Sequence, residues 1–143
     1  MKRILMLAFA AVLSMSVSAC QDNTSPGAVL SGTYTLRSVN NQPTPVILYD
    51  DFSGREELLG GYIRLDRNGT YTDVVTLRDT PPGSSPGQQY DDTINGTWSL
   101  SGDQLQLTDF TDPNNPYYAT VSGSNLIFQN YASGTSYTIV YSK

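Results

Sequence analysis

The chain has 143 residues and a formal net charge of −5, with 13 acidic and eight basic side chains, no histidine and one cysteine. The acidic balance argues against nucleic acid as a partner, because nucleic acids and anionic surfaces are bound by basic patches. The absence of histidine excludes serine and cysteine triads that depend on it, and also the usual zinc, copper and haem sites.

The first 20 residues, MKRILMLAFAAVLSMSVSAC, have the layout of an export signal. Lys2 and Arg3 precede an apolar run at 4–13, which is too short for a transmembrane helix, since a span needs about 20 apolar residues. The end of the segment, VSAC at 17–20, resembles the bacterial lipobox. This resemblance implies that the peptide is cut before Cys20, and that Cys20 carries a diacylglyceryl group and a further acyl chain such as palmitate. An ordinary signal peptide that ends near a cysteine is the alternative.

We favour the lipoprotein, because Cys20 is the only cysteine and occupies the one position that the motif requires. Residues 1–19 are then the signal peptide, and the mature chain of 124 residues is long enough for one domain, with a net charge of −7. Acyl chains anchor such a protein in a membrane, each buried CH₂ adding about 0.8 kcal/mol. Gln21, rather than an aspartate after the cysteine, favours the outer membrane by resemblance to the bacterial sorting rule. With the thiol acylated, no cysteine remains for a disulfide or for catalysis.

The segment that follows the cysteine is polar. Residues 20–31 comprise the acylated cysteine and the sequence QDNTSPGAVLS, in which Pro26 and Gly27 disfavour regular structure. We therefore predict a flexible tether between the lipid and the folded domain.

Residues 32–143 are predicted to form an all-β domain. Thr, Tyr, Val and Ile are plentiful, turn residues such as Asn68-Gly69 recur at short intervals, and no 3.6-residue periodicity runs for long. The longest predicted loop, 80–87, is rich in Pro and Gly. We predict nine strands, at about 32–39, 45–52, 56–66, 69–79, 89–100, 104–110, 116–122, 125–131 and 135–142.

Residues 53–60 can be interpreted in two ways. Ser53 and Glu56 have the spacing of a helix capping box, and Gly60-Gly61 could end a short helix. Alternatively, Ser53-Gly54 forms a hairpin turn, and the following strand contains a glycine bulge. We favour the hairpin, because three helical turns do not fit before Gly60 and the sequence YIRL continues as a strand.

A Gly-Thr-aromatic pattern occurs three times, as GTYT at 32–35, GTYT at 69–72 and GTWS at 96–99. The intervals of 37 and 27 residues are unequal, which argues against a solenoid repeat. Each occurrence is interpreted as the beginning of a strand after a turn, in which Gly supplies the turn geometry and the β-branched Thr favours extended backbone.

Short strands joined by hairpins fit a sandwich or a closed barrel, and closure is favoured because it removes exposed edges. We therefore predict a small antiparallel up-and-down β-barrel of about eight to nine strands, whose interior is filled by side chains or holds one small ligand. The sequences GTYTL at 32–36, GTWSL at 96–100 and YTLRSVNNQPTP at 34–45 resemble the small bacterial lipocalin-like lipoproteins. True lipocalins pair a Gly-x-Trp on the first strand with an Arg near the last. This chain departs from that pattern: it has Tyr34 at the Trp position, and only Lys143 follows the last predicted strand.

The chain offers little for catalysis. Adjacent acids such as Asp50-Asp51 and Asp91-Asp92 would point to opposite faces of a strand, which is poor geometry for an acid/base pair. We therefore expect no enzyme, no catalytic residue, no metal site and no cofactor.

The remaining candidates for a binding site are aromatic residues. Strand alternation places Tyr71 and Asp73 on one face, and together with Tyr34 and Trp98 they are candidates to line the mouth of the barrel. For any single Tyr or Trp, packing in the core or the barrel wall is the alternative interpretation.

Two functions remain open. The first is a membrane-anchored binding protein whose barrel holds a small apolar or amphipathic ligand. The second is an interaction or structural lipoprotein with a filled barrel, which docks an envelope protein or inhibits an enzyme through its loops. The resemblance favours the first, and the volume inside the barrel distinguishes the two.

Overall fold

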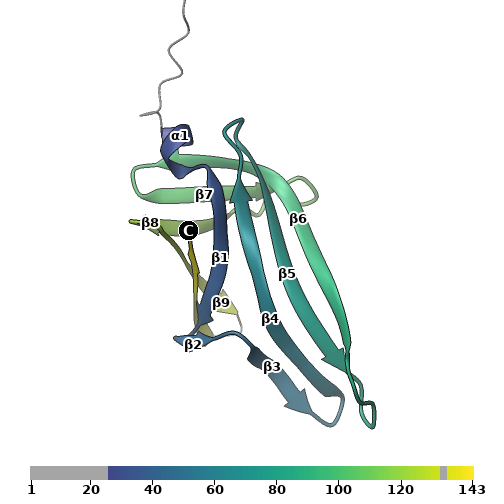
Figure 1. The fold of residues 1–143 in the computed structure, drawn as a ribbon. Helices are drawn as coiled ribbons and strands as arrows, with labels where there is room; N and C mark the ends of the chain where they lie inside the picture. Colours follow the sequence, from purple (N-terminus) through teal and green to yellow (C-terminus); the bar gives the residue numbers. More distant parts are fainter. Residues whose placement is uncertain (1–25, 133–134) are drawn as a thin grey trace, which may run out of the picture.

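The computed structural model describes residues 26–132 and 135–143, which form one antiparallel β-barrel (Figure 1). Its elements are α1 (Pro26–Leu30), β1 (Gly32–Val39), β2 (Gln42–Pro43), β3 (Val46–Asp51), β4 (Gly54–Leu65), β5 (Thr70–Thr80), β6 (Gln88–Ser101), β7 (Gln104–Asp109), β8 (Tyr117–Ser122), β9 (Asn125–Ala132) and β10 (Thr135–Ser142). The predicted all-β, up-and-down barrel is confirmed. The predicted signal peptide and Cys20 lie outside the described residues.

Eight strands close the barrel, because β1 pairs with β10 on one side and with β4 on the other. The first half of β1 is hydrogen-bonded to the end of β4, from Gly32 opposite Leu65 to Thr35 opposite Tyr62. Beyond this point β3 replaces β1 as the neighbour of β4. The long strands β4, β5 and β6 therefore extend past the closed part of the barrel, with β3 beside them (Figure 1).

The predicted hairpin at 53–60 is confirmed. Ser53 donates from its backbone N–H and its hydroxyl to the carboxylate of Asp51, at 2.7 and 2.5 Å, and this closes the turn. Gly54 has a φ of +134°, a conformation that favours glycine. The pairing of β4 with β5 then shifts between Leu58 and Gly60, which is the predicted glycine bulge.

The prediction of a tether does not hold for its last residues, because Pro26–Leu30 form α1. The side chain of Leu30 is only 5% exposed and belongs to the core, and its carbonyl accepts a 2.8 Å hydrogen bond from the hydroxyl of Tyr34. Leu30 thus docks the helix on the end of the barrel. The described residues contain no helix that is long and apolar enough to cross a membrane.

The two ends of the barrel differ. Under α1 the interior is filled by large apolar side chains that are almost fully buried, and we call this the covered end. The side chains packed there include Tyr34, Leu65, Leu105, Leu107 and Leu126. The opposite end, toward β3 and the β5–β6 hairpin, is where the long strands project (Figure 1). We call it the mouth.

The three Gly-Thr-aromatic sequences are placed differently from one another. Gly32 begins β1 and Gly69 precedes β5, and both have positive φ angles, of 137° and 85°. Gly96, however, lies inside β6 and does not begin a strand, so the prediction is wrong there. Its role is close approach: a Cβ atom at Gly96 would collide with the carbonyl oxygen of Thr108 and lie 2.6 Å from Cε1 of Tyr71.

Candidate ligand-binding pocket

An open pocket of about 360 Å³ lies at the mouth, and we call it the mouth pocket. Its volume falls within the range of about 300–1,000 Å³ that is usual for small-molecule sites. Six strands contribute to its walls, and of the described residues that line it only Asp92 is charged. The lining residues are Leu36, Val39, Leu48, Leu58, Val75, Leu77, Asp92, Tyr137, Ile139 and Tyr141.

A second, smaller cavity of about 70 Å³ lies deeper in the barrel. It is lined by Ile63, Asp73, Tyr117, Phe128, Ile139 and Tyr141. Ile139 and Tyr141 belong to both linings, so the small cavity adjoins the mouth pocket, and we call it the floor cavity. A space of this size has room for a water molecule or a small polar group.

Asp73 is the polar residue of the floor cavity. Its side chain is 8% exposed, its Oδ1 atom is fully buried, and no described residue forms a hydrogen bond to it. Burial, together with the charge of Asp92, raises the pKa of the Asp73 carboxyl from 3.8 to about 7. Asp73 therefore changes its protonation state close to neutral pH.

Aromatic rings surround this carboxyl. The ring of Tyr117 meets that of Tyr71 edge-on, with 6.1 Å between centroids, and the Tyr117 hydroxyl donates a 2.8 Å hydrogen bond to the Tyr71 hydroxyl. Phe128 lies 6.1 Å from Tyr117 and 5.7 Å from Tyr141, again between centroids. Burial raises the pKa of both Tyr117 and Tyr141, so these hydroxyls stay protonated at neutral pH.

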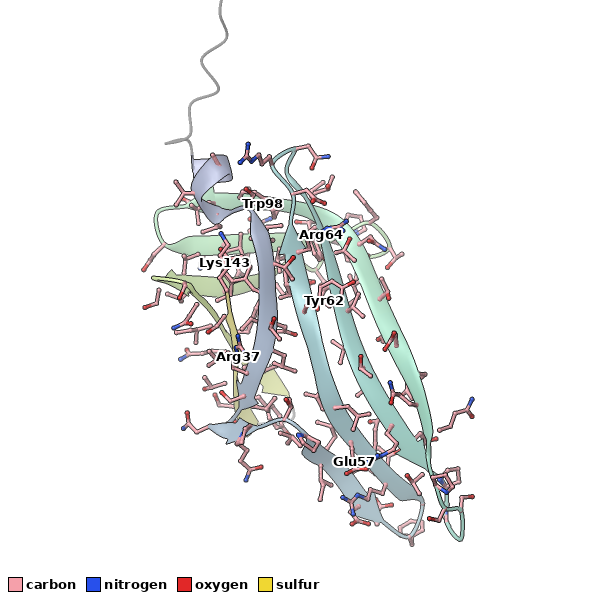
Figure 2. All side chains as sticks on the ribbon, in the orientation of Figure 1. Arg37, Glu57, Tyr62, Arg64, Trp98 and Lys143 are labelled. Atoms are coloured by element: carbon pink, nitrogen blue, oxygen red, sulfur yellow. The ribbon has the colours of Figure 1, made fainter. Side chains whose placement is uncertain are left out.

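The structure separates the four predicted ligand-lining residues. Asp73 lines the floor cavity. Tyr71 is 1% exposed and is not part of that lining, but its hydroxyl accepts a hydrogen bond from Tyr117, which is. Trp98 lies at the covered end beside α1 (Figure 2), where its Nε1 donates to the carbonyl of Asp66 at 3.0 Å. Trp98 is therefore not at the mouth.

Tyr34 also lies at the covered end, with its hydroxyl on the carbonyl of Leu30. The ammonium of Lys143 is 5.0 Å from the centroid of the Tyr34 ring, within the distance of a cation–π interaction. Tyr34, which stands where lipocalins have Trp, is thus in contact with the basic residue that follows the last strand, although neither lines the mouth pocket or the floor cavity.

The alternation of side chains along the predicted strands did not identify most of the residues that line the pocket. Tyr117, Phe128 and Tyr141 were not among the predicted ligand-lining residues, and neither were Leu48 and Leu77 from the mouth. Some of these lining residues could have been predicted from the sequence, because Tyr137, Ile139 and Tyr141 alternate along the last strand and so share one face. Within residues 26–132 and 135–143, no group of three or more acidic or cysteine side chains is placed to hold a metal ion.

The barrel agrees with a comparison of the sequence with known families. A family model described as a lipocalin-like domain matches residues 30–128, which is more than half of the chain. This match begins at the Leu30 that docks α1 and runs through β8 into β9. No curated protein sequence matches the chain. On its sequence match and its closed eight-stranded barrel, the chain belongs to the lipocalin-like domain family.

Proposed function

We propose that this chain is a lipid-anchored, non-enzymatic binding protein whose mouth pocket holds a small apolar or amphipathic ligand. The observation that carries this proposal is an apolar, open pocket of about 360 Å³ in a barrel that is filled at its other end. An apolar ligand that enters such a pocket is stabilised by about 25 cal/mol for each Å² removed from water. A barrel filled along its whole length, as the alternative function requires, would leave no such pocket.

The anchor and the pocket would lie at opposite ends of the barrel. Pro26 begins α1 at the covered end, six residues after Cys20. Acylation at Cys20 would therefore attach the lipid near the covered end and turn the mouth away from the attachment point. Such an orientation leaves the pocket accessible while the protein is held on the outer membrane of a bacterial envelope.

Filling the pocket tests the binding function. Val75→Trp places a large ring in the mouth pocket, and we expect it to weaken binding of the neutral fluorophore N-phenylnaphthylamine by about tenfold or more, since overfilled interiors do not accept further volume. The measurement is a fluorescence titration of the mature protein.

Val74→Trp is the matched control. Val74 pairs with Tyr62, whose side chain lies on the outer surface (Figure 2), so the added ring stays outside the barrel. We expect this variant to bind the fluorophore as the unmodified protein does. Absence of binding by the unmodified protein, or equal binding by Val75→Trp, would contradict the proposal.

Cys20→Ser tests the anchor. A hydroxyl at this position cannot form the thioether, so we expect the variant to leave the membrane fraction, whereas the unmodified protein stays there because several acyl chains hold it. Mass spectrometry of the mature N-terminus should show the added mass of diacylglyceryl and acyl groups on Cys20. An unmodified cysteine, or a Cys20→Ser variant still bound to membranes, would rule the anchor out.

A further inference from the structure

We infer that the ligand is an amphipathic cation, whose apolar part lies in the mouth pocket and whose cationic group reaches the Asp73 carboxylate in the floor cavity. This inference rests on the proposed function and narrows it to one class of ligand. It is carried by three features of the barrel interior: a carboxyl without a partner, a series of acids on the inner face, and basic residues placed elsewhere.

The first feature is the isolation of Asp73. Buried polar side chains in proteins are nearly always hydrogen-bonded, and buried charges are paired, because removal from water without a partner is costly. Asp73 is 8% exposed, and its buried Oδ1 atom has no partner among the described residues. It lines the floor cavity, which adjoins the mouth pocket. A ligand group that enters from the mouth can therefore supply the missing partner.

The second feature is the negative charge of the inner surface of the barrel. Asp73 and Asp79 lie on the inner face of β5 at alternating positions, with Val75 between them in the mouth pocket. Residues directly opposite each other on paired strands share a face. Asp92 is opposite Val75, and Glu56 is opposite Asp79, so both acids face inward as well. Carboxylates thus run from the rim of the mouth to its floor.

The third feature is the placement of the basic residues. Arg55 and Arg78 hold Glu57 at 2.8 and 2.6 Å on the outer face of β4 and β5, and Lys143 lies over Tyr34 at the covered end (Figure 2). None of the six basic residues in the described part of the chain lines the mouth pocket or the floor cavity; these residues are Arg37, Arg55, Arg64, Arg67, Arg78 and Lys143.

The aromatic lining fits the same ligand class. Tyr117, Phe128 and Tyr141 present ring systems around Asp73, and cations are attracted to the faces of such rings. An anionic amphiphile would instead meet Asp73 and Asp92 without a compensating positive charge. The interior therefore selects against fatty-acid carboxylates and favours amines and other organic cations with an apolar tail.

Three probes with the same tail separate these classes: decylammonium, decanol and decanoate. Each would displace N-phenylnaphthylamine from the mature protein at pH 8, where Asp73 is ionised and decylammonium keeps its charge. We expect decylammonium to bind about tenfold or more tightly than decanol, as is typical of a buried charge-assisted hydrogen bond, and decanoate to bind most weakly.

Asp73→Asn should remove the preference, so that decylammonium and decanol bind alike. Asp91→Asn is the matched control, because it makes the same change of charge on β6 but faces outward, where Asp91 accepts a hydrogen bond from Thr76. We expect Asp91→Asn to keep the full preference.

Protons should compete with the cation. Facing Asp73 are Asp92 from β6 and the hydroxyls of Tyr71, Tyr117 and Tyr141, while β4 and β9 contribute the apolar Ile63 and Phe128. The raised pKa values of these tyrosines keep them neutral between pH 6 and pH 8. Because the pKa of Asp73 is about 7, decylammonium should bind about tenfold more weakly at pH 6 than at pH 8. Decanol should show no such change.

The outcomes are distinguishable. If the unmodified protein does not bind the fluorophore, the proposed function fails. If the fluorophore binds but decanol or decanoate competes as well as decylammonium, the binding function stands and the cationic ligand is overturned. The same conclusion follows if Asp73→Asn retains the preference for decylammonium. Because the comparison of the three probes uses the unmodified protein, it does not depend on the folding of any variant.

Discussion

Gly96→Ala is expected to lower the free energy of unfolding by about 3 kcal/mol or more, because the added methyl group has no space. It would collide with the carbonyl oxygen of Thr108 and lie 2.6 Å from the ring of Tyr71. The first of these atoms belongs to the backbone of a neighbouring strand, which cannot rotate away as the end of a flexible side chain can.

The position of Gly96 in the barrel makes the strain hard to relieve. Gly96 is paired with Tyr71 of β5 on one side and with Asp109 of β7 on the other, so a shift of its backbone would disturb both pairings. Tyr71 is itself held by the hydroxyl of Tyr117. The tight packing at Gly96 therefore helps to position the ring of Tyr71, whose partner Tyr117 lines the floor cavity.

Urea denaturation of both Gly96→Ala and Gly60→Ala measures this effect. Gly60 is the matched control, because a Cβ atom there would meet nothing within 4 Å. Alanine at Gly60 should change stability by no more than about 1 kcal/mol, with a small gain expected from the loss of glycine's flexibility in the unfolded chain. Equal losses in the two variants, or a Gly96→Ala variant as stable as the unmodified protein, would contradict the steric argument.

Most of the fold could be predicted from local sequence, because hairpins are specified locally. The Asn68-Gly69 turn, for example, is closed by the Asn68 side chain, which accepts hydrogen bonds from the backbone and hydroxyl of Thr70 at 3.1 and 2.7 Å. Turn residues and β-branched runs together set the strand boundaries, and closure follows from the need to satisfy the edges.

The residues that line the pocket were harder to predict from the sequence, and the reason is geometric. Alternation states which face of a strand a side chain occupies, but not at which height along the barrel axis it lies. Tyr34 and Trp98 do face inward, yet they lie at the covered end, whereas Asp73 lies at the floor of the pocket. The height depends on the stagger between strands, which is set by bulges and by distant pairings such as that of β1 with β4.

Asp73 is expected to make the folded state less stable as the pH rises from 5 to 8, by about 3 kcal/mol. Its pKa is about 7 in the folded protein and 3.8 in the absence of the fold, so between these values the folded state binds a proton that the unfolded state releases. Stability from this group is therefore greatest at low pH and is lost as the pH approaches 7. The cause is the cost of an ionised carboxylate in an apolar cavity.

The range from pH 5 to pH 8 isolates this effect. The pKa values of Asp51 and Glu57 are lowered, by hydrogen bonds from Ser53 and from Arg78 respectively, so these groups stabilise the fold above their unfolded pKa values of 3.8 and 4.5. Their contribution is lost only below this range, as the pH falls through their folded pKa values. Urea unfolding of Asp73→Asn should show no fall in stability between pH 5 and pH 8, whereas Asp91→Asn should keep it.

The same measurement links the fold to the ligand. If Asp73 lowers stability at pH 8 because its charge has no partner, a bound decylammonium should restore that stability more strongly at pH 8 than at pH 5, beyond the effect of binding the tail alone. Decanol should raise stability equally at both values. A pH slope that persists in Asp73→Asn would instead locate the titrating group elsewhere, and it would remove the electrostatic reason for assigning the cation to the floor cavity.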